Sequence, residues 1–291
     1  MSSIYEQSSL CVTPNAKKAG KLYALKGADL DVVRATTATY VGSDGLIKTA
    51  LANEVRFDYT NGSCPSILVE PQRTNLLLRS EEFNVSPWGT LGTVTITPNS
   101  TIAPNGNNTA DLILGNNASS SISQIYSGSI GVVYTSSFFI KNNNSTQSQL
   151  LIRNASTVVD ATLNWTGSVL SSITNTTGIT TFKSYNNGWY RIMSTYTSVE
   201  AAQRPRILPT LSTNQSVYIW GAQLEAGANA TSYIQTVASS VTRNADVISK
   251  SGLSGITSIT ETFENGTTNV ISGSPTSYTM SQGRIKHVIG L

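Results

Sequence analysis

The chain has little charge and almost no histidine. Asp, Glu, Lys and Arg make up 12% of its 291 residues, about half of the ~25% that is usual in soluble domains. The only histidine is His287, close to the C-terminal end. A single histidine excludes Ser/His/Asp and Cys/His catalysis and most zinc sites. We therefore predict no catalytic residue of these kinds and no metal site.

Cysteines and long apolar runs are scarce as well. The two cysteines, Cys11 and Cys64, are too few for a disulfide scaffold and lack metal-ligand spacing, so we expect two reduced thiols. The absence of any run of about 18 apolar residues argues against membrane insertion. Nucleic-acid binders concentrate positive charge on one face. Here Lys and Arg are scattered and the net charge is +3, so we predict no nucleic-acid partner.

What the chain does contain is typical of β-structure. Val, Ile, Thr and Tyr are abundant, and these residues favour pleated, half-buried surfaces. Between about residues 65 and 240, short β-rich runs recur with polar turns between them and no long helical pattern. This spacing predicts an all-β protein, namely a two-sheet antiparallel jelly-roll or lectin-like sandwich.

We predict four segments along the chain. Residues 1–33 form an N-terminal arm, residues 34–64 a β-hairpin lead-in, residues 65–248 the sandwich, and residues 249–291 a small β-rich C-terminal tail. The loop 42–45 separates two β-rich runs and predicts a hairpin with a four-residue loop. The tail is too small to bury a core alone, so it must pack on the sandwich or on another chain.

An ordered set of phrases resembles bacteriophage fibre and virion surface proteins that carry a lectin-like, carbohydrate-binding-module-like β-sandwich. Each phrase is weak evidence by itself. All of them occur in the same order as in those proteins, over residues 34–248, which makes the resemblance more specific. The phrases are 39–41 with 44–50 and 53–59; 70–78 with 80–83 and Trp88; 187–192; 220–234; and 241–246.

The resemblance implies a non-enzymatic virion structural protein, either a head fibre or a tail fibre. It implies display at the virion surface after synthesis in the bacterial host cytoplasm. It also implies a homo-oligomer, most commonly a trimer, with other virion proteins and host-surface or environmental glycans as partners. By the same resemblance, residues 1–33 are expected to dock on the particle.

Two alternatives remain open. One is a glycan depolymerase on the same sandwich, because paired carboxylates can hydrolyse glycosides without histidine. Its candidate acids are Glu81, Glu82, Asp160 and Glu225. The other alternative is a purely structural capsid decoration protein without a glycan ligand.

The candidate carbohydrate-binding residues are Trp165, Trp88 and Arg73. Flat aromatic rings suit the C–H faces of sugars, and Arg recognises carboxylates. Trp189 and Trp220 lie in strongly apolar runs and are expected in the core. Trp165 follows a polar run and is the best candidate for an exposed platform, with core packing as the alternative. Structural pairing is the alternative for Arg73 and for four further charged residues: Arg191, Glu225, Glu70 and Glu82.

The loop 104–111 is rich in oxygen atoms and raises the question of a bound ion. Calcium takes six to eight oxygen ligands, but Asp111 is the only carboxylate in this loop. We expect no cofactor and a turn in which Asn side chains accept hydrogen bonds from the backbone. A structural Ca²⁺ is the alternative.

Overall fold

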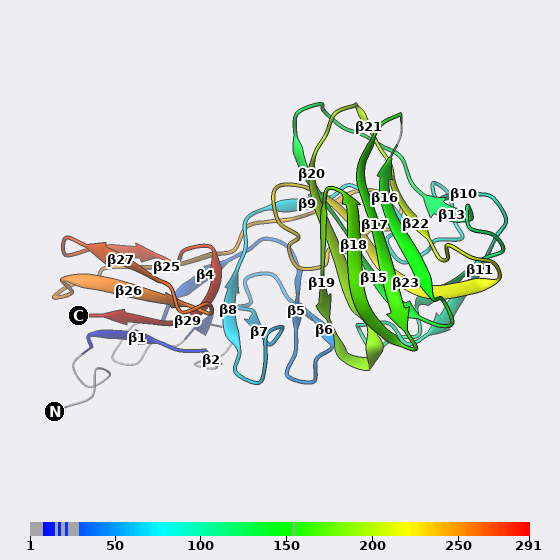
Figure 1. The fold of residues 1–291 in the computed structure, drawn as a ribbon. Coiled ribbons are helices and arrows are strands. Elements are labelled where there is room, and N and C mark those ends of the chain that lie inside the picture. Colours follow the sequence, from blue (N-terminus) through cyan, green and yellow to red (C-terminus); the bar gives the residue numbers. More distant parts are fainter. Residues whose placement is uncertain (1–7, 15–16, 19–20, 23–28, 154) are drawn as a thin grey trace. The chain divides into compact units, whose positions relative to one another are not determined.

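The computed structural model describes residues 8–14, 17–18, 21–22, 29–153 and 155–291. Within these ranges the regular structure is almost entirely β-strand, and the single helical element is the 3₁₀ turn η1 (Asn186–Gly188). The all-β prediction is therefore confirmed. No helix in the described part of the chain has the length and apolar character to span a membrane. The chain divides into unit 1 (Met1–Arg73 and Arg243–Leu291) and unit 2 (Thr74–Thr242) (Figure 1).

Unit 2 contains two six-stranded antiparallel sheets. The β23 sheet has the order β11 (Val94–Thr101), β12 (Ala110–Gly115), β23 (Gln215–Ala226), β15 (Val133–Asn142), β20 (Tyr190–Thr197) and β19 (Ile179–Ser184). The β17 sheet has the order β10 (Gly89–Leu91), β13 (Ser121–Ser123), β22 (Pro205–Leu208), β16 (Gln147–Arg153), β17 (Thr157–Thr166) and β18 (Val169–Thr177).

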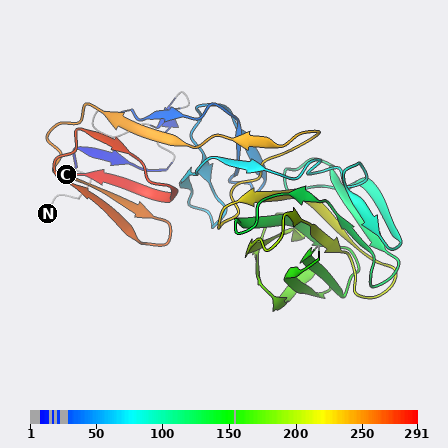
Figure 2. The ribbon, with the colours of Figure 1, turned by 90° about the horizontal axis from the view of Figure 1, so that it is seen from above.

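The two sheets stack as layers around one apolar core (Figure 2). Strand β17 shows why, because its residues alternate between buried and half-buried positions, as expected of a strand with one face on a core. Its inward side chains are Val159, Ala161, Leu163 and Trp165. This arrangement confirms the two-sheet antiparallel sandwich.

Two further short strand pairs are present. Strand β14 (Tyr126–Ser127) pairs with β21 (Ala202–Gln203), and β9 (Arg73–Asn75) pairs with β24 (Val241–Arg243). The second pair joins the segments by which the chain enters and leaves unit 2, so unit 2 is an insertion between the two halves of unit 1.

Unit 1 is a second, smaller β-structure. Its β29 sheet has the order β27 (Thr268–Ser272), β26 (Ser258–Phe263), β29 (Gly283–Gly290), β8 (Ser66–Val69) and β7 (Phe57–Asp58), and β1 (Leu10–Val12) also pairs with β29. Its β25 sheet has the order β28 (Ser277–Thr279), β25 (Val247–Ser251) and β4 (Asp31–Val33). Two hairpins complete it: β2 (Lys17–Lys18) with β3 (Lys21–Leu22), and β5 (Ala38–Val41) with β6 (Ile47–Ala50).

This division differs from the predicted segments. The tail is part of unit 1 and not a separate segment, because β29 pairs with β26 along one edge and with β8 and β1 along the other (Figure 1). Residues of the predicted arm, lead-in, sandwich and tail share one apolar core that includes Leu30, Val55, Ile67 and Ile285. Of the predicted docking arm, residues 1–7, 15–16, 19–20 and 23–28 lie outside the described residues.

A network of buried ion pairs links distant segments of unit 1. Asp246 accepts from Arg34 Nη1 at 2.7 Å and also pairs with Arg56. Glu70 accepts from Arg56 Nη1 at 2.8 Å and from Arg243 Nη1 at 2.9 Å. The three arginine side chains are at most 1% exposed. The network therefore ties the N-terminal part of unit 1 to the segment that returns from unit 2.

Candidate functional site

The structure buries both tryptophans that the sequence offers as sugar platforms. Trp165 is 7% exposed, and its Nε1 donates to Ser148 Oγ at 2.6 Å. Trp88 is 9% exposed, and its Nε1 donates to the carbonyl of Arg79 at 2.9 Å. The prediction that Trp165 is exposed is wrong, because the residue occupies an inward position of β17 in the core of unit 2. A ring packed on both faces offers no stacking surface to a sugar.

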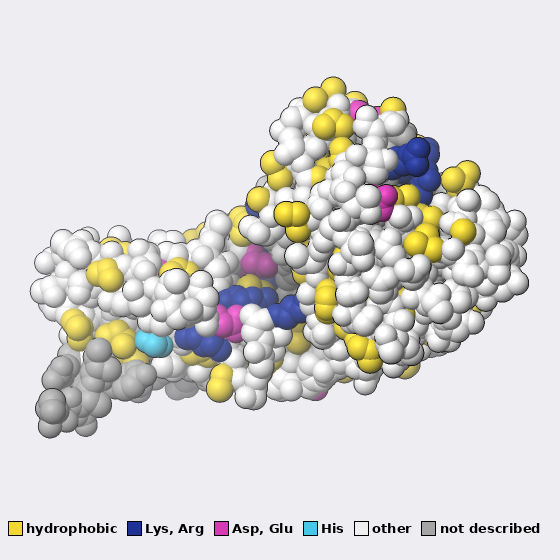
Figure 3. Space-filling model, viewed as in Figure 1, with side chains coloured by type: hydrophobic (Ala, Val, Ile, Leu, Met, Phe, Trp, Pro, Cys, Tyr) yellow, Lys and Arg dark blue, Asp and Glu magenta, His cyan; other side chains and the backbone are white. Residues whose placement is uncertain are grey.

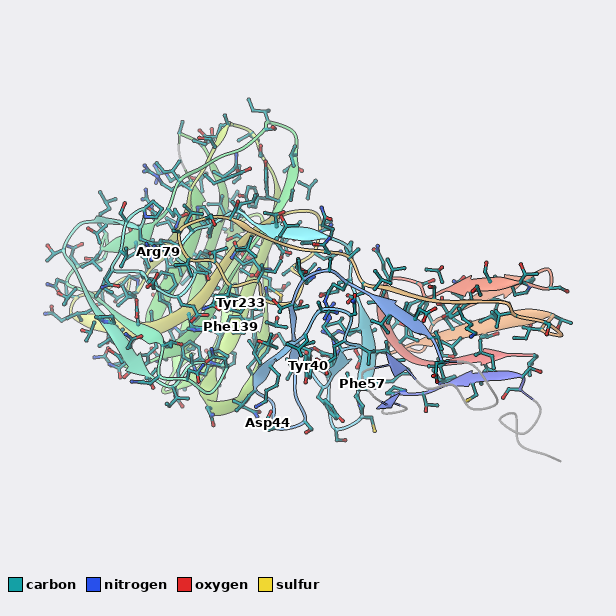
Figure 4. The ribbon with its side chains drawn as sticks, turned by 180° about the vertical axis from the view of Figure 1, so that it is seen from behind. Tyr40, Asp44, Phe57, Arg79, Phe139 and Tyr233 are labelled. Atoms are coloured by element: carbon teal, nitrogen blue, oxygen red, sulfur yellow. The ribbon has the colours of Figure 1, made fainter. Side chains whose placement is uncertain are left out.

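Trp189 and Trp220 lie in the interior, as predicted. Trp220 is fully buried, and its ring lies 4.4 Å from that of Tyr233 and 5.4 Å from that of Phe139, between ring centres. Its Nε1 donates to Thr109 Oγ1 at 3.0 Å. Figure 4 marks Phe139 and Tyr233 of this cluster. The aromatic residues of unit 2 therefore serve mainly to pack it.

Arg73 does not join a site with the tryptophans. It lies at the start of β9, is half-buried, and donates from Nη1 to the carbonyl of Gln72 at 2.9 Å. Among the described contacts none links Arg73 to Trp88 or Trp165. The structure therefore does not bring the three predicted residues together.

Arg191 and Glu225 have structural roles, in agreement with the alternative that the sequence favoured. Arg191 donates to the carbonyl of Thr231 at 2.7 Å and to Ser137 Oγ at 2.9 Å, and its guanidinium lies over the Phe139 ring at 5.3 Å. The Glu225 carboxylate accepts from the backbone N–H of Thr231 at 3.0 Å and from its hydroxyl. Together they fasten the segment after β23 to the outer face of the β23 sheet.

The acids of the depolymerase alternative also have structural partners. Glu81 accepts from the Tyr233 hydroxyl at 2.8 Å, and Glu82 pairs with Arg79 at 2.8 Å. Asp160 accepts from Gln149 Nε2 at 2.7 Å. With Glu225 bound to Thr231 as described above, each of the four carboxylates has a role in holding the fold.

Glu81 predicts a pH dependence of stability. Burial raises the pKa of Glu81 above its usual range, although hydrogen bonds, chiefly from Tyr233, act in the opposite direction. The folded chain therefore holds this proton more tightly than the unfolded chain does. The resulting stabilisation is fully present below the unfolded pKa and is lost as pH rises through the raised folded pKa. Glu81→Gln, which stays neutral, should become more stable relative to the wild type as pH rises from 4 to 8 in urea titrations.

A neighbouring variant provides the control for this experiment. Glu82→Gln removes a carboxylate that pairs with Arg79 near solvent, so it should not reproduce the pH-dependent gain of Glu81→Gln. An unchanged stability difference across the pH range in Glu81→Gln would contradict the effect assigned to burial.

The loop 104–111 does not fit a calcium ion. Asp111 is 1% exposed, and its two carboxylate oxygens accept from the backbone N–H groups of Phe83 at 2.9 Å and Asn99 at 3.0 Å. Asn105 Oδ1 accepts from the N–H of Asn107 at 3.0 Å, which confirms the predicted Asn turn. The only carboxylate of the loop is thus bound to the backbone, and we propose no metal site there.

A different group of aromatic residues lines a concavity in unit 1. Tyr40, Phe57 and Tyr59 are half-buried, and the ion pair between Lys48 and Asp44, 2.7 Å from Nζ to Oδ2, lies beside them. The concavity has a volume of about 500 Å³, within the range of about 300–1,000 Å³ usual for small-molecule sites. We call it the aromatic pocket. Its full lining is Tyr40, Gly42, Ser43, Asp44, Lys48, Thr49, Val55, Phe57 and Tyr59.

The hairpin loop sets one wall of this pocket. Loop 42–45 joins β5 to β6, as the sequence predicted. The N–H of Gly42 donates to the carbonyl of Leu46 at 2.8 Å, and Gly45 has φ of 74°, a region that glycine adopts without strain. The register pairs Tyr40 with Lys48 across the two strands. A ring and an ammonium group therefore lie side by side on one face of the hairpin.

A buried carboxylate, Asp58, holds the segment that carries Phe57 and Tyr59 against the hairpin. Asp58 is 2% exposed and accepts from the N–H of Val41 at 3.0 Å, while the N–H of Tyr59 donates to the carbonyl of Val41 at 2.9 Å. Side chains two apart on an extended segment share a face. Phe57 and Tyr59 therefore point away from Asp58 and toward the pocket, beside Tyr40 (Figure 4 marks Tyr40, Asp44 and Phe57).

The pocket combines apolar faces with a few polar groups. Its three rings present C–H and π surface, while Lys48, Asp44 and Thr49 provide donors and acceptors at its edge. Sequence reasoning missed it because it considered only tryptophans as platforms. The sequence feature that could have indicated the pocket is the pair Phe57 and Tyr59, two residues apart, after a hairpin that contains Tyr40.

Comparisons with known proteins identify no family. No family model and no curated protein matches the sequence. Several solved structures show a distant likeness. The CBM22-1–CBM22-2 tandem domain of Paenibacillus barcinonensis Xyn10C is 12% identical with a TM-score of 0.36, over 76% of this chain and 84% of that one.

Two further structures cover smaller parts. The enzymatically active domain of bacteriophage CBA120 tailspike protein 4 is 16% identical with a TM-score of 0.34, over 52% of this chain and 21% of that one. The CBM22-1–GH10 modules of a Clostridium thermocellum xylanase, complexed with xylohexaose, are 18% identical with a TM-score of 0.32, over 48% and 26%. This chain thus spans only a minor part of the last two. The TM-scores are low, so we take neither function nor ligand from these likenesses.

Proposed function

We propose that this chain is a non-enzymatic glycan-binding protein and that the aromatic pocket of unit 1 receives a sugar ring. One observation supports the proposal above the others: three half-buried rings, from Tyr40, Phe57 and Tyr59, line a single concavity beside an ion pair. Sugars present C–H faces to aromatic rings and hydroxyl groups to polar side chains. Both kinds of partner are available in this pocket.

The polar edge determines how a hydroxyl-rich ligand would be held. Lys48 is a pure donor, the Asp44 carboxylate a pure acceptor, and the Thr49 hydroxyl can be either. The Lys48 and Asp44 side chains are 40% and 49% exposed, so they can bind ligand hydroxyls without large desolvation. A site of this openness favours modest affinity for a single sugar unit.

We also propose that the protein is displayed on a phage virion as a homo-oligomer, most simply a trimer, that contacts other virion proteins. This part rests on the ordered phrases at residues 39–59, 70–88, 187–192, 220–234 and 241–246. Repeated copies would raise avidity for a repetitive glycan surface by orders of magnitude without new contacts. Sedimentation of a monomer at all accessible concentrations would contradict this part of the proposal.

Glycan binding is tested by substitutions in the pocket. Phe57→Ala and Tyr59→Ala should each weaken binding to the glycans selected on an array by about 5- to 30-fold, corresponding to about 1–2 kcal/mol for a central aromatic contact. Tyr59→Phe keeps the ring and should retain most of the affinity. Isothermal titration calorimetry with the selected oligosaccharide gives the numbers.

A matched control uses an aromatic residue elsewhere. Phe182→Ala removes a ring that is 39% exposed on β19 of unit 2 and should leave glycan affinity unchanged. An empty glycan array, or equal affinities for Phe57→Ala and the wild type, would overturn the glycan-binding proposal. Release of reducing ends from a bound polysaccharide would instead support the depolymerase alternative.

A further inference from the structure

The outer face of the β17 sheet in unit 2 carries a ladder of polar side chains. Gln147 Nε2 donates to Asn164 Oδ1 at 2.8 Å, and Asn164 Nδ2 donates to Thr174 Oγ1 at 3.1 Å. The next rung pairs Gln149 with Thr162. These residues alternate with the buried ones of the same strands, so they point away from the core. The face is therefore rich in groups that can exchange hydrogen bonds with hydroxyls.

Three arginines gather at one end of this face. Arg153 ends β16, and its N–H donates to the carbonyl of Arg204 at 3.3 Å. Arg206 follows two residues later on β22, opposite Leu151. The register that pairs Ile152 with Pro205 thus places Arg153 beside Arg204. We call Arg153, Arg204 and Arg206 the arginine cluster. Figure 3 shows Lys and Arg side chains gathered by the upper end of β16.

The three arginines of the cluster form no ion pair with a described residue. Like charges that face each other across strands destabilise a sheet. Burial lowers the pKa of Arg206, and the neighbouring charges of Arg204 and Arg153 lower it further. Within the described ranges no carboxylate lies within 4.0 Å of any of the three guanidinium groups. The Nε atoms of Arg204 and Arg206 are buried without a hydrogen-bond partner.

The nearest acids have other partners. Asp160, across β16 from Arg206, accepts from Gln149 at 2.7 Å. Glu200 shares a small hollow with Arg153 and Arg204, and its two carboxylate oxygens accept from the N–H groups of Ala155 and Ser156 at 3.2 and 3.0 Å. The sheet thus holds three cations together, and no carboxylate of the described residues forms an ion pair with them.

We propose that the arginine cluster binds an acidic polysaccharide, holding its carboxylate or sulfate groups while the polar ladder binds neighbouring hydroxyls. Planar guanidinium groups match both anions with paired N–H donors. This would be a second ligand site, on unit 2, separate from the aromatic pocket of unit 1. Three clustered positive charges with hydroxyl-binding groups beside them suit a polymer that alternates anionic groups and hydroxyls.

The same face is poorly suited to nucleic acid. Single strands are held by aromatic residues on which bases stack, but the outward positions of the paired strands β13, β16, β17, β18 and β22 carry no aromatic ring. Duplexes are held by a long basic stripe. Here the cluster ends at Asp160 on the next strand, and the net charge of the chain is only +3.

The experiment measures binding of the full chain to alginate, polygalacturonate, heparin and neutral dextran by affinity electrophoresis and calorimetry at 50 and 200 mM salt. Wild-type protein should bind at least one acidic polymer, with affinity that falls at the higher salt, and should bind dextran weakly or not at all through this site. The double variant Arg204→Gln with Arg206→Gln should lose about tenfold in affinity or more, because charge-assisted hydrogen bonds are removed. The polymer that binds distinguishes carboxylate from sulfate as the anion.

A second double variant provides the control. Lys141→Gln with Lys183→Gln removes the same charge from the β23 sheet of unit 2 and should keep the affinity. An equal loss of affinity in both double variants would show that net charge alone causes the binding, and would overturn the proposal. Tighter binding of poly-dT or duplex DNA than of every acidic polysaccharide would overturn it as well. The aromatic-pocket variant Tyr59→Ala should leave the affinity for acidic polymers unchanged. The proposals for the two sites are therefore tested separately.

Urea unfolding of Arg206→Gln shows whether a loss of binding in this variant could come from misfolding. Since the arginines repel each other, Arg206→Gln should fold and should raise the midpoint of urea unfolding at low salt, a gain that disappears at high salt. A lowered midpoint would show that Arg206 is held by favourable internal contacts, and the argument for an external anion would then be lost.

Discussion

Asp246→Ala is expected to lower the free energy of unfolding of unit 1 by about 3–5 kcal/mol, the range for removing one partner from a buried ion pair. The Asp246 carboxylate is 2% exposed and pairs with Arg34 and Arg56, whose side chains are fully buried. It also accepts from the N–H of Glu70 at 2.8 Å. Its removal leaves two buried cations, and Arg56 keeps a carboxylate partner, Glu70.

Two probes separate the units in this experiment. The four tryptophans, at positions 88, 165, 189 and 220, all lie within unit 2 (Thr74–Thr242). Tryptophan fluorescence therefore follows unit 2, while far-UV circular dichroism follows both units. In urea, the variant should show an early transition by circular dichroism that is absent from the fluorescence. An equal shift in both signals would contradict the assignment of the network to a separate unit.

An exposed ion pair provides the comparison. Lys48→Ala removes the partner of Asp44 at a hairpin where both side chains are 40–49% exposed, and surface pairs of this kind contribute little to stability. The variant should unfold at nearly the wild-type urea concentration. A loss in Lys48→Ala as large as that in Asp246→Ala would show that burial is not the cause.

Trp165→Ala should destabilise unit 2 by about 3–5 kcal/mol, as other truncations of large buried aromatic residues do. The ring is 7% exposed and its centre lies 5.8 Å from that of Tyr190 in an edge-to-face contact. The truncation leaves a cavity between the sheets and removes the donor to Ser148 Oγ. Thermal and urea unfolding followed by the three remaining tryptophans measures the loss.

A milder substitution divides the two contributions. Trp165→Phe keeps a ring in the core but still leaves Ser148 without its donor, so it should cost about 1–3 kcal/mol. Neither variant should change glycan affinity at the aromatic pocket at temperatures where both are folded. A stable Trp165→Ala protein that has lost glycan binding would restore Trp165 as a sugar platform.

The sequence predicted much of the local structure correctly. The hairpin around loop 42–45 and the sandwich between the β17 and β23 sheets follow from alternation and turn residues, which act over a few positions. The site was harder, since Trp165 was judged by the polar residues before it. In fact those residues are the outward half of β17, and the alternation places the ring inward.

The division into units could not be found in this way. A tail of short strands that cannot bury a core alone indicates only that it must pack against something. Its actual partners are β1, at residues 10–12, and β8, at residues 66–69. Nothing in the local pattern of residues 249–291 distinguishes these partners from the sandwich, because strand pairing depends on backbone groups that every strand offers.

By itself the sequence determined the all-β class, the antiparallel sandwich of unit 2 and the burial of Trp189 and Trp220, because side-chain alternation and hydrophobicity are local properties. Only the tertiary structure decided that both ends of the chain build one unit, and that Tyr40, Phe57 and Tyr59 share a pocket. It also brought Arg34 to Asp246, 212 positions away. The physical reason is that a buried charge or an open ring depends on what packs against it, and those partners lie far along the chain.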